Sequence, residues 1–200
     1  MKVGFRMIFS KKYLEEIKII ASQIDLACIE EMVKILIQLK LRNGRLFILG
    51  IGGSASNASH AANDFRKLAG IEAYAPTDNI SEVTARTNDE GFDSVFTSSL
   101  KVSKLNVNDC ILILSVGGGD LEKGISKNIC LAIELAKARK VQIIGIVGRK
   151  GGCTYLHADA CLVIPQVNPL YITQHSEAFQ AIIWHLLVSH PDLKENLTKW

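Results

Sequence analysis

The sequence has few of the features that assign a chain to a specialised class of protein. Its five cysteines form no CxxC pair, and Cys110 and Cys161 instead begin apolar runs, which predicts buried, reduced thiols. No apolar run approaches the length of a membrane-spanning helix, and the first residues lack the apolar stretch of a signal peptide. We therefore expect a cytoplasmic protein that has no membrane partner.

An excess of charge of one sign is also missing. The formal net charge is only +3, and the lysines and arginines are dispersed along the chain. Nucleic-acid-binding domains concentrate their basic residues on one face, so no nucleic-acid partner is predicted. The chain has no internal repeat, low-complexity tract or linker, and 200 residues with 48% hydrophobic side chains suit one globular domain.

Five short apolar stretches have the composition of buried strands. Most run without alternation of polar and apolar residues, which is typical of parallel strands covered by helices on both faces. Segments with helical spacing lie between them, at about residues 55–69, 79–102, 125–139 and 175–190. This order predicts an α/β fold, a doubly wound parallel sheet with right-handed crossovers. The expected strands are Leu46–Gly50, Ala73–Ala75, Ile111–Ser115, Val141–Val147 and Cys161–Ile164.

A long helical pattern precedes the first strand. Between Lys11 and Leu41 apolar residues recur at helical spacing, and Asp25 suits the N-cap of a second helix. Asn43 and Gly44 favour the end of that helix. We expect helices over residues 1–44 that extend the domain formed by residues 45–200. Their apolar surface is too long for one domain to cover, which favours an oligomer interface.

The first expected strand ends in a glycine-rich turn. Gly52 and Gly53 are followed by Ser54 and Ser56, small hydroxyl residues that suit the start of a helix. Backbone N–H groups at a helix N-terminus favour an anion, most often a phosphate. No Gly-Lys-Ser/Thr sequence closes the turn as in a Walker loop, and Ala55 stands where a dinucleotide fingerprint needs its third glycine. A tight turn without a ligand is the alternative.

Three glycine-rich loops are expected at one edge of the sheet. They follow the first, third and fourth strands and span residues 50–56, 115–120 and 148–152. In doubly wound sheets, ligands bind outside the carboxyl ends of the strands, where the strand order reverses. The three loops together therefore favour a small-molecule site over a set of short turns.

Two expected helices carry ionisable residues at spacings that bring them onto one face. His60 and Asp64 are four residues apart, and Glu177 and His185 are eight apart within an otherwise apolar pattern. Polar groups in an apolar stripe cost free energy unless a partner satisfies them. Two histidines with two carboxylates suit a divalent metal such as zinc or an acid–base pair, whereas each of them alone also suits a structural role.

Taken in order, these motifs resemble the phosphoheptose isomerases of the sugar isomerase (SIS) family. The shared features span about residues 10–190 and are Gly52-Gly53-Ser54, His60 with its carboxylate, the sequence TNDEGF at residues 87–92, Gly151-Gly152 and the helix with Glu177 and His185. The resemblance implies a five-stranded, flavodoxin-like sheet and a homotetramer with active sites between subunits. It also implies conversion of sedoheptulose 7-phosphate to D-glycero-D-manno-heptose 7-phosphate, towards nucleotide-activated heptose for surface polysaccharides.

The resemblance also implies roles for individual residues. His60 matches a metal-binding histidine, Asp64 stands where the family has a glutamate that acts as base and ligand, and His185 matches the catalytic histidine that also binds zinc. Glu177 stands where the family usually has a glutamine. We therefore expect Asp64 and His185 to be catalytic, and one zinc ion per subunit to be held in one pocket by His60, Asp64, Glu177 and His185. The expected substrate contacts are Gly52, Gly53, Ser54, Ser56, Asp89, Ser115, Gly117, Gly118 and Glu177.

The second glycine-rich loop departs from the family. Phosphoheptose isomerases have serines and threonines there, whereas this chain keeps Ser115 and continues Val-Gly-Gly-Gly-Asp. A glycine nest can still bind an anion, and Lys123 or another subunit can supply positive charge. Asp120 repels a phosphate unless it caps the next helix or faces away. A different sugar phosphate as substrate, and a non-catalytic sugar-phosphate-binding regulator or assembly protein, therefore stay open.

Overall fold

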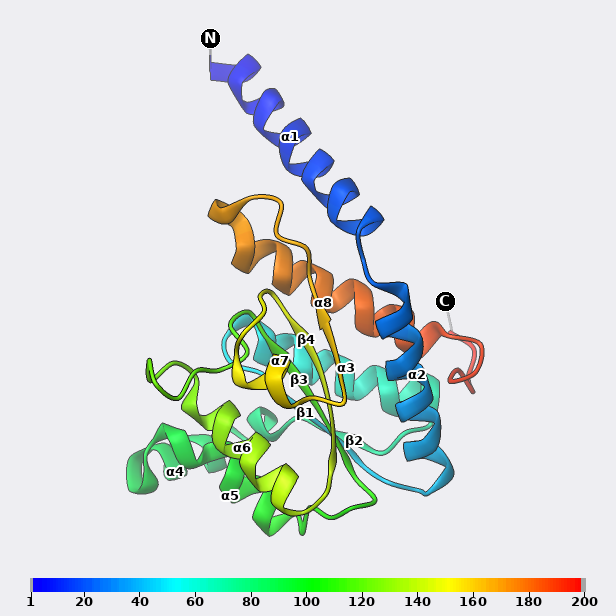
Figure 1. Ribbon diagram of the computed structural model, residues 1–200, viewed down its shortest axis with the longest axis vertical. Coiled ribbons are helices and arrows are strands. Elements are labelled where there is room, and N and C mark those ends of the chain that lie inside the picture. Colours follow the sequence, from blue (N-terminus) through cyan, green and yellow to red (C-terminus); the bar gives the residue numbers. More distant parts are fainter. Residues whose placement is uncertain (1, 199–200) are drawn as a thin grey trace.

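A five-stranded parallel sheet forms the centre of the protein. The computed structural model describes residues 2–198 (Figure 1). The strand order is β2-β1-β3-β4-β5, and every neighbouring pair is parallel. This arrangement confirms the expected α/β fold with a doubly wound sheet. The strands are β1 (Leu46–Leu49), β2 (Ala73–Tyr74), β3 (Cys110–Ser115), β4 (Gln142–Val147) and β5 (Ala160–Val163).

Helices cover both faces of the sheet (Figure 1). Ile48 of β1 and Leu112 of β3 pack in a core with α2, α3 and α8, whereas Leu49 and Ile113 pack in a second core with α5 and α6. The described α-helices are α1 (Lys2–Ser22), α2 (Leu26–Leu41), α3 (Gly53–Ala69), α4 (Ile80–Glu90), α5 (Val95–Val102), α6 (Lys127–Ala138), α7 (Cys153–His157) and α8 (Ile172–Ser189). Among them, none is long and apolar enough to cross a membrane.

The two expected N-terminal helices are present. The Asp25 carboxylate accepts a hydrogen bond of 3.1 Å from the backbone N–H of Cys28, and so caps α2. The end of α2 lies where it was expected, with Asn43 in a left-handed conformation and the Gly44 N–H donating to the carbonyl of Leu39. Helix α1 extends away from the body of the chain (Figure 1).

Two expectations about the chain are corrected. The helical pattern over 79–102 is divided at Gly91, whose φ of 83° ends α4, and a 3-10 turn (Phe92–Ser94) leads into α5. The expectation of reduced thiols is wrong for Cys130 and Cys153, which form a disulfide between α6 and α7, while Cys110 and Cys161 are free thiols. Cys130 and Cys153 are 23 residues apart in the sequence, and the packing of α7 on α6 brings them together.

The strand order reverses between β1 and β3. The chain leaves β1 into α3 on one face of the sheet and leaves β3 towards α6 on the other face. The loops after these two strands therefore diverge at the carboxyl edge of the sheet, which is where a doubly wound fold binds its ligand.

Candidate active site

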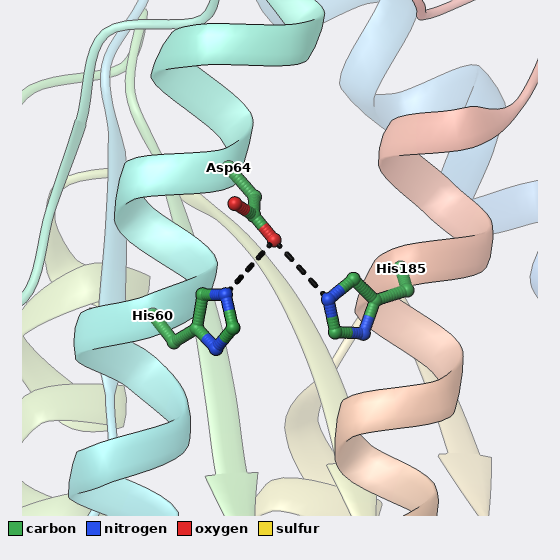
Figure 2. A group of neighbouring side chains, drawn as sticks. All are labelled: His60, Asp64 and His185. Carbon is green, nitrogen blue, oxygen red and sulfur yellow. Dashed lines mark ion pairs between the residues drawn. The ribbon is translucent and has the colours of Figure 1, made fainter. Parts of the chain in front are cut away.

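Three of the expected metal ligands lie together between α3 and α8. Figure 2 shows His60 and Asp64 on α3 and His185 on α8, with both imidazoles directed at one carboxylate oxygen. The Nε2 atoms of His60 and His185 lie 3.5 Å and 3.3 Å from Oδ2 of Asp64. His60 and Asp64 meet because residues four apart are neighbours on one helix face, and the packing of α3 on α8 adds His185.

Hydrogen bonds hold the Asp64 carboxylate in place. Its Oδ2 accepts from Nε1 of Trp184 at 3.3 Å, and its Oδ1 accepts from the amide of Asn63 at 3.1 Å. The Asp64 side chain is 11% exposed, whereas those of His60 and His185 are 58% and 49% exposed. The group is thus anchored on its buried carboxylate and open to solvent on the histidine side.

A contact of Nδ1, the ring nitrogen that faces away from Asp64, orients His185. Nδ1 lies 2.7 Å from the carbonyl oxygen of Ala181. Since a carbonyl can only accept, Nδ1 donates, and the Nε2 of a neutral ring then carries the lone pair. That lone pair is on the nitrogen that faces Asp64.

This donor set fits a zinc ion. One atom from each of His60, Asp64 and His185 lies within 4.8 Å of the others. Catalytic zinc sites typically have three protein ligands of these kinds and keep one position open. The partners behind the ligands also fit, because Ala181 orients His185, and Trp184 and Asn63 orient Asp64.

Glu177 is not part of this group. It precedes His185 by eight residues, which is about 12 Å along a helix axis. Its carboxylate lies at the start of α3, where a Cβ atom added at Gly53 would be 2.6 Å from it. Asn57 fixes this part of α8, since its amide donates to the Glu177 carbonyl and to the side chain of Gln180, each at 2.9 Å. The four expected ligands are therefore divided into a group of three and a separate carboxylate.

A cavity of about 520 Å³ lies at the carboxyl edge of the sheet. The expected substrate-binding residues Ser54, Ser115, Gly117 and Glu177 line it. Gly53 lies against Glu177, and Gly118 is held to Thr154 of α7, whose backbone N–H and hydroxyl donate to its carbonyl. The other lining residues are Ile51, Val116, Ile125, Ser126, Arg149, Pro169, Ile172 and Thr173.

Other expected substrate contacts lie elsewhere. Asp89 is exposed on α4, accepts a hydrogen bond from Asn88, and does not line this cavity. Ser56 is exposed on α3, and Gly52 precedes that helix with a φ of 63°.

The acidic residue of the second loop is paired. Asp120 forms an ion pair of 3.1 Å with Lys123, whose backbone N–H also donates to the Asp120 carboxylate. These interactions with Lys123 hold the pKa of the Asp120 carboxyl below its ordinary value. Asp120 is therefore paired with Lys123, and it does not line the cavity.

Sequence reasoning missed Trp184, Asn57 and Arg149. The position of Trp184 directly before His185 was a signal for its role. Arg149 lies in the third glycine-rich loop, the place where a basic residue near the strand ends could have been singled out.

Comparisons with known proteins agree with this architecture. The model of the SIS domain family matches residues 12–148. A phosphoheptose isomerase of Helicobacter pylori is 32% identical over 142 residues, which are 68% of this chain and 70% of that protein. The lincomycin biosynthesis protein LmbN of Streptomyces lincolnensis is 32% identical over 154 residues, 74% of this chain and 56% of that protein.

A solved structure shares the fold. The phosphoheptose isomerase GmhA from Neisseria gonorrhoeae superposes with a TM-score of 0.79, covering 93% of this chain and 96% of that chain at 24% sequence identity. Five parallel strands, the preceding helices and the match to the family model lead to one conclusion. The chain belongs to the SIS domain family.

Proposed function

We propose that the protein is a sugar-phosphate isomerase that converts the ketose sedoheptulose 7-phosphate to the aldose D-glycero-D-manno-heptose 7-phosphate. The observation that carries this proposal is the group of His60, Asp64 and His185 between α3 and α8. The similarity to phosphoheptose isomerases supports the choice of substrate. The product would enter the synthesis of nucleotide-activated heptose.

The reaction moves one proton between C1 and C2 through an enediolate. Asp64, whose Oδ2 faces both histidines, takes the proton from C1 of the ketose and returns it to C2. His185 moves a proton between the oxygens on the same two carbons through Nε2, the nitrogen that faces Asp64, while the Ala181 carbonyl holds its Nδ1. Trp184 and Asn63 keep the carboxylate in position during both transfers.

His60, Asp64 and His185 would hold a zinc ion. When bound, zinc polarises carbonyl and hydroxyl oxygens and so stabilises the charge that develops in an enediolate. Coordination would lower the basicity of Asp64 and would engage Nε2 of His185, so the ligand and proton-transfer roles compete at both residues. Glu177 faces the cavity and would contact the sugar.

Subunit contacts would complete the site. The half-exposed side chains of His60 and His185 place the group at the surface of the single chain. In the proposed homotetramer, a neighbouring subunit covers this surface and excludes water from the enediolate.

The test is turnover of sedoheptulose 7-phosphate by the purified protein, followed by NMR at the anomeric carbons. One sample is loaded with zinc and another is stripped with a chelator. We expect the aldose to form, with a faster rate in the zinc-loaded sample. Absence of aldose with and without zinc would overturn the proposal.

A sugar-phosphate-binding regulator is the second candidate. The observation in its favour is the second loop, where Ser115 is followed by three glycines instead of hydroxyl residues. Calorimetry with sedoheptulose 7-phosphate separates the two candidates, because a regulator binds the sugar phosphate without converting it.

A further inference from the structure

Arg149 lines the cavity at the carboxyl edge of the sheet, directly over the second glycine-rich loop. A Cβ atom added at Gly117 would lie 3.1 Å from Nη2, 3.6 Å from Nε and 3.7 Å from Cζ of Arg149, so the guanidinium covers this glycine. Ser54, Ser115 and Ser126 line the same cavity. Within residues 2–198, Arg149 has no ion pair or hydrogen bond to another residue.

Gly117 lies directly against this arginine. Gly118 and Gly119 have φ values of 75° and 81°, a conformation that disfavours side chains, but Gly117 does not have a positive φ. Its backbone would therefore accept another residue. What a side chain would meet there is the guanidinium of Arg149.

The backbone that carries Arg149 is fixed to both neighbouring segments. The N–H of Gly148 donates to the carbonyl of Val116 at 3.0 Å, and the Gln166 amide donates to the carbonyl of Gly148 at 2.7 Å. A Cβ atom at Gly148 would collide with Ser176 of α8. The start of the Arg149 side chain is thus held against the second loop.

Positive charge in the cavity comes from Arg149. Glu177 of α8 is the other charged lining residue, and its carboxylate lies against Gly53 at the start of α3. The backbone of the second loop offers an anion fewer free N–H donors than a glycine nest would, because the Gly118 N–H donates to Oγ of Ser115 at 3.0 Å. An arginine guanidinium binds phosphate through two parallel hydrogen bonds.

We propose that Arg149 binds the phosphate group of the substrate, in place of the hydroxyl side chains that phosphoheptose isomerases have in this loop. The proposal rests on the proposed function in that it takes the ligand to be a sugar phosphate. The ligand class is a phosphomonoester dianion, held by the guanidinium and the hydroxyls of Ser54, Ser115 and Ser126.

Calorimetric titration of Arg149→Ala with inorganic phosphate and with sedoheptulose 7-phosphate tests this assignment. The matched control is Lys150→Ala, because Lys150 is the next residue, is exposed, has the same charge and does not line this cavity. We expect the Kd for both ligands to rise by about 10- to 100-fold in Arg149→Ala, as for loss of a charged hydrogen bond, and to change less than about twofold in the control. The Kd values of Arg149→Lys should lie between those of Arg149→Ala and those of the control.

The coupling to Gly117 gives a second measurement. Gly117→Ala should weaken phosphate binding in the wild-type background, because the added methyl group lies 3.1 Å from Nη2 and shifts the guanidinium. It should have no further effect in Arg149→Ala. Unchanged phosphate affinity in Arg149→Ala, or an equal loss in Lys150→Ala, would overturn the assignment. If the wild type binds phosphate through Arg149 but does not convert the sugar, the proposed function fails and the phosphate site stands. If the wild type converts the sugar and Arg149→Ala binds both ligands normally, the phosphate site alone fails.

Discussion

The Asp64 carboxylate is the residue on which the candidate active site depends. It is mostly buried, accepts hydrogen bonds from Trp184 and Asn63, and has both site histidines at 3.3–3.5 Å from one oxygen. The hydrogen bonds from Trp184 and Asn63 keep this carboxylate oriented. Although its side chain is short, Asp64 of α3 reaches His185 on α8.

Replacement of Asp64 by asparagine should lower kcat by about 10²- to 10⁴-fold, the usual size of general acid–base catalysis. An amide keeps the shape but cannot take up the proton. Turnover of sedoheptulose 7-phosphate is measured, with Asp192→Asn, an exposed carboxylate after α8, as the control. Retention of wild-type kcat in Asp64→Asn would exclude this residue as the base.

Replacement of His185 by alanine should abolish turnover and weaken zinc binding, because it removes a proton donor and a ligand together. Zinc stoichiometry after dialysis and kcat are the two measurements. His157→Ala is the control, since His157 is exposed at the end of α7. Full zinc occupancy in His185→Ala would show that the ion is held elsewhere.

The free thiols in the sheet should be unreactive in the folded protein. Burial raises the pKa of Cys110 and of Cys161 to about 12. At pH 8 the reactive thiolate is then only about one part in 10⁴ of each thiol. Mass spectrometry after iodoacetamide treatment should find both residues unmodified in native protein and alkylated in urea. Equal labelling rates in the two states would contradict this prediction.

At the scale of elements, α8 connects the site to the rest of the fold. Its start contacts the cavity through Glu177, its middle is tied to α3 by Asn57 and Gln180, and its end contributes His185. Near its beginning, the buried His175 also contacts α1, because Nε2 lies 2.9 Å from the Glu16 carboxylate. The amide of Asn168 donates to the other oxygen of Glu16 at 2.7 Å.

This contact should make the docking of α1 depend on pH. The hydrogen bonds from His175 and Asn168 hold the pKa of Glu16 below its ordinary value of 4.5. A carboxyl whose folded-state pKa is lowered stabilises the fold above its unfolded-state pKa, and this contribution is lost as the pH falls through the folded-state value. The free energy of unfolding of Glu16→Gln should therefore be lower than that of the wild type at pH 7, and the difference should shrink below about pH 4.5.

Urea denaturation at a series of pH values measures this difference. Glu31→Gln is the control, because Glu31 is exposed on α2 and pairs with Lys34. The difference in the free energy of unfolding between Glu16→Gln and the wild type could instead stay constant down to pH 3. That result would argue against the Glu16 contact as the source of the difference.

At the scale of the whole molecule, α1 leaves apolar side chains uncovered. It extends from the body of the chain (Figure 1), and Ile8, Phe9, Leu14 and Ile19 are exposed large hydrophobic residues on it. Apolar surface of this kind marks a protein–protein interface. The proposed homotetramer would bury it against other copies of the chain.

Light scattering coupled to size exclusion should therefore show a tetramer at micromolar concentration. Leu14→Glu should shift the population to smaller species, because it places a charge within the apolar surface of α1. Val107→Glu, an exposed apolar position in the turn before β3, is the control. A monomeric wild type would contradict both the tetramer and the shared active site.

Local patterns in the sequence predict the order and type of most elements. Continuous apolar runs are enough to place buried parallel strands, and the side chain of Asp25 is enough to start α2. The spacing of His60 and Asp64 also placed them together, because a separation of four residues is a contact within a single helix. These features depend on neighbours in the chain.

Tertiary structure decided the features that depend on distant segments. Helical spacing shows that Glu177 and His185 share a face of α8, but the packing on α3 determines that His185 meets Asp64 while Glu177 meets Gly53. The disulfide of Cys130 and Cys153 likewise required α7 to pack on α6. A sequence pattern predicts on which face of a helix a side chain lies. Which residues that side chain contacts depends on the second element that packs against this face.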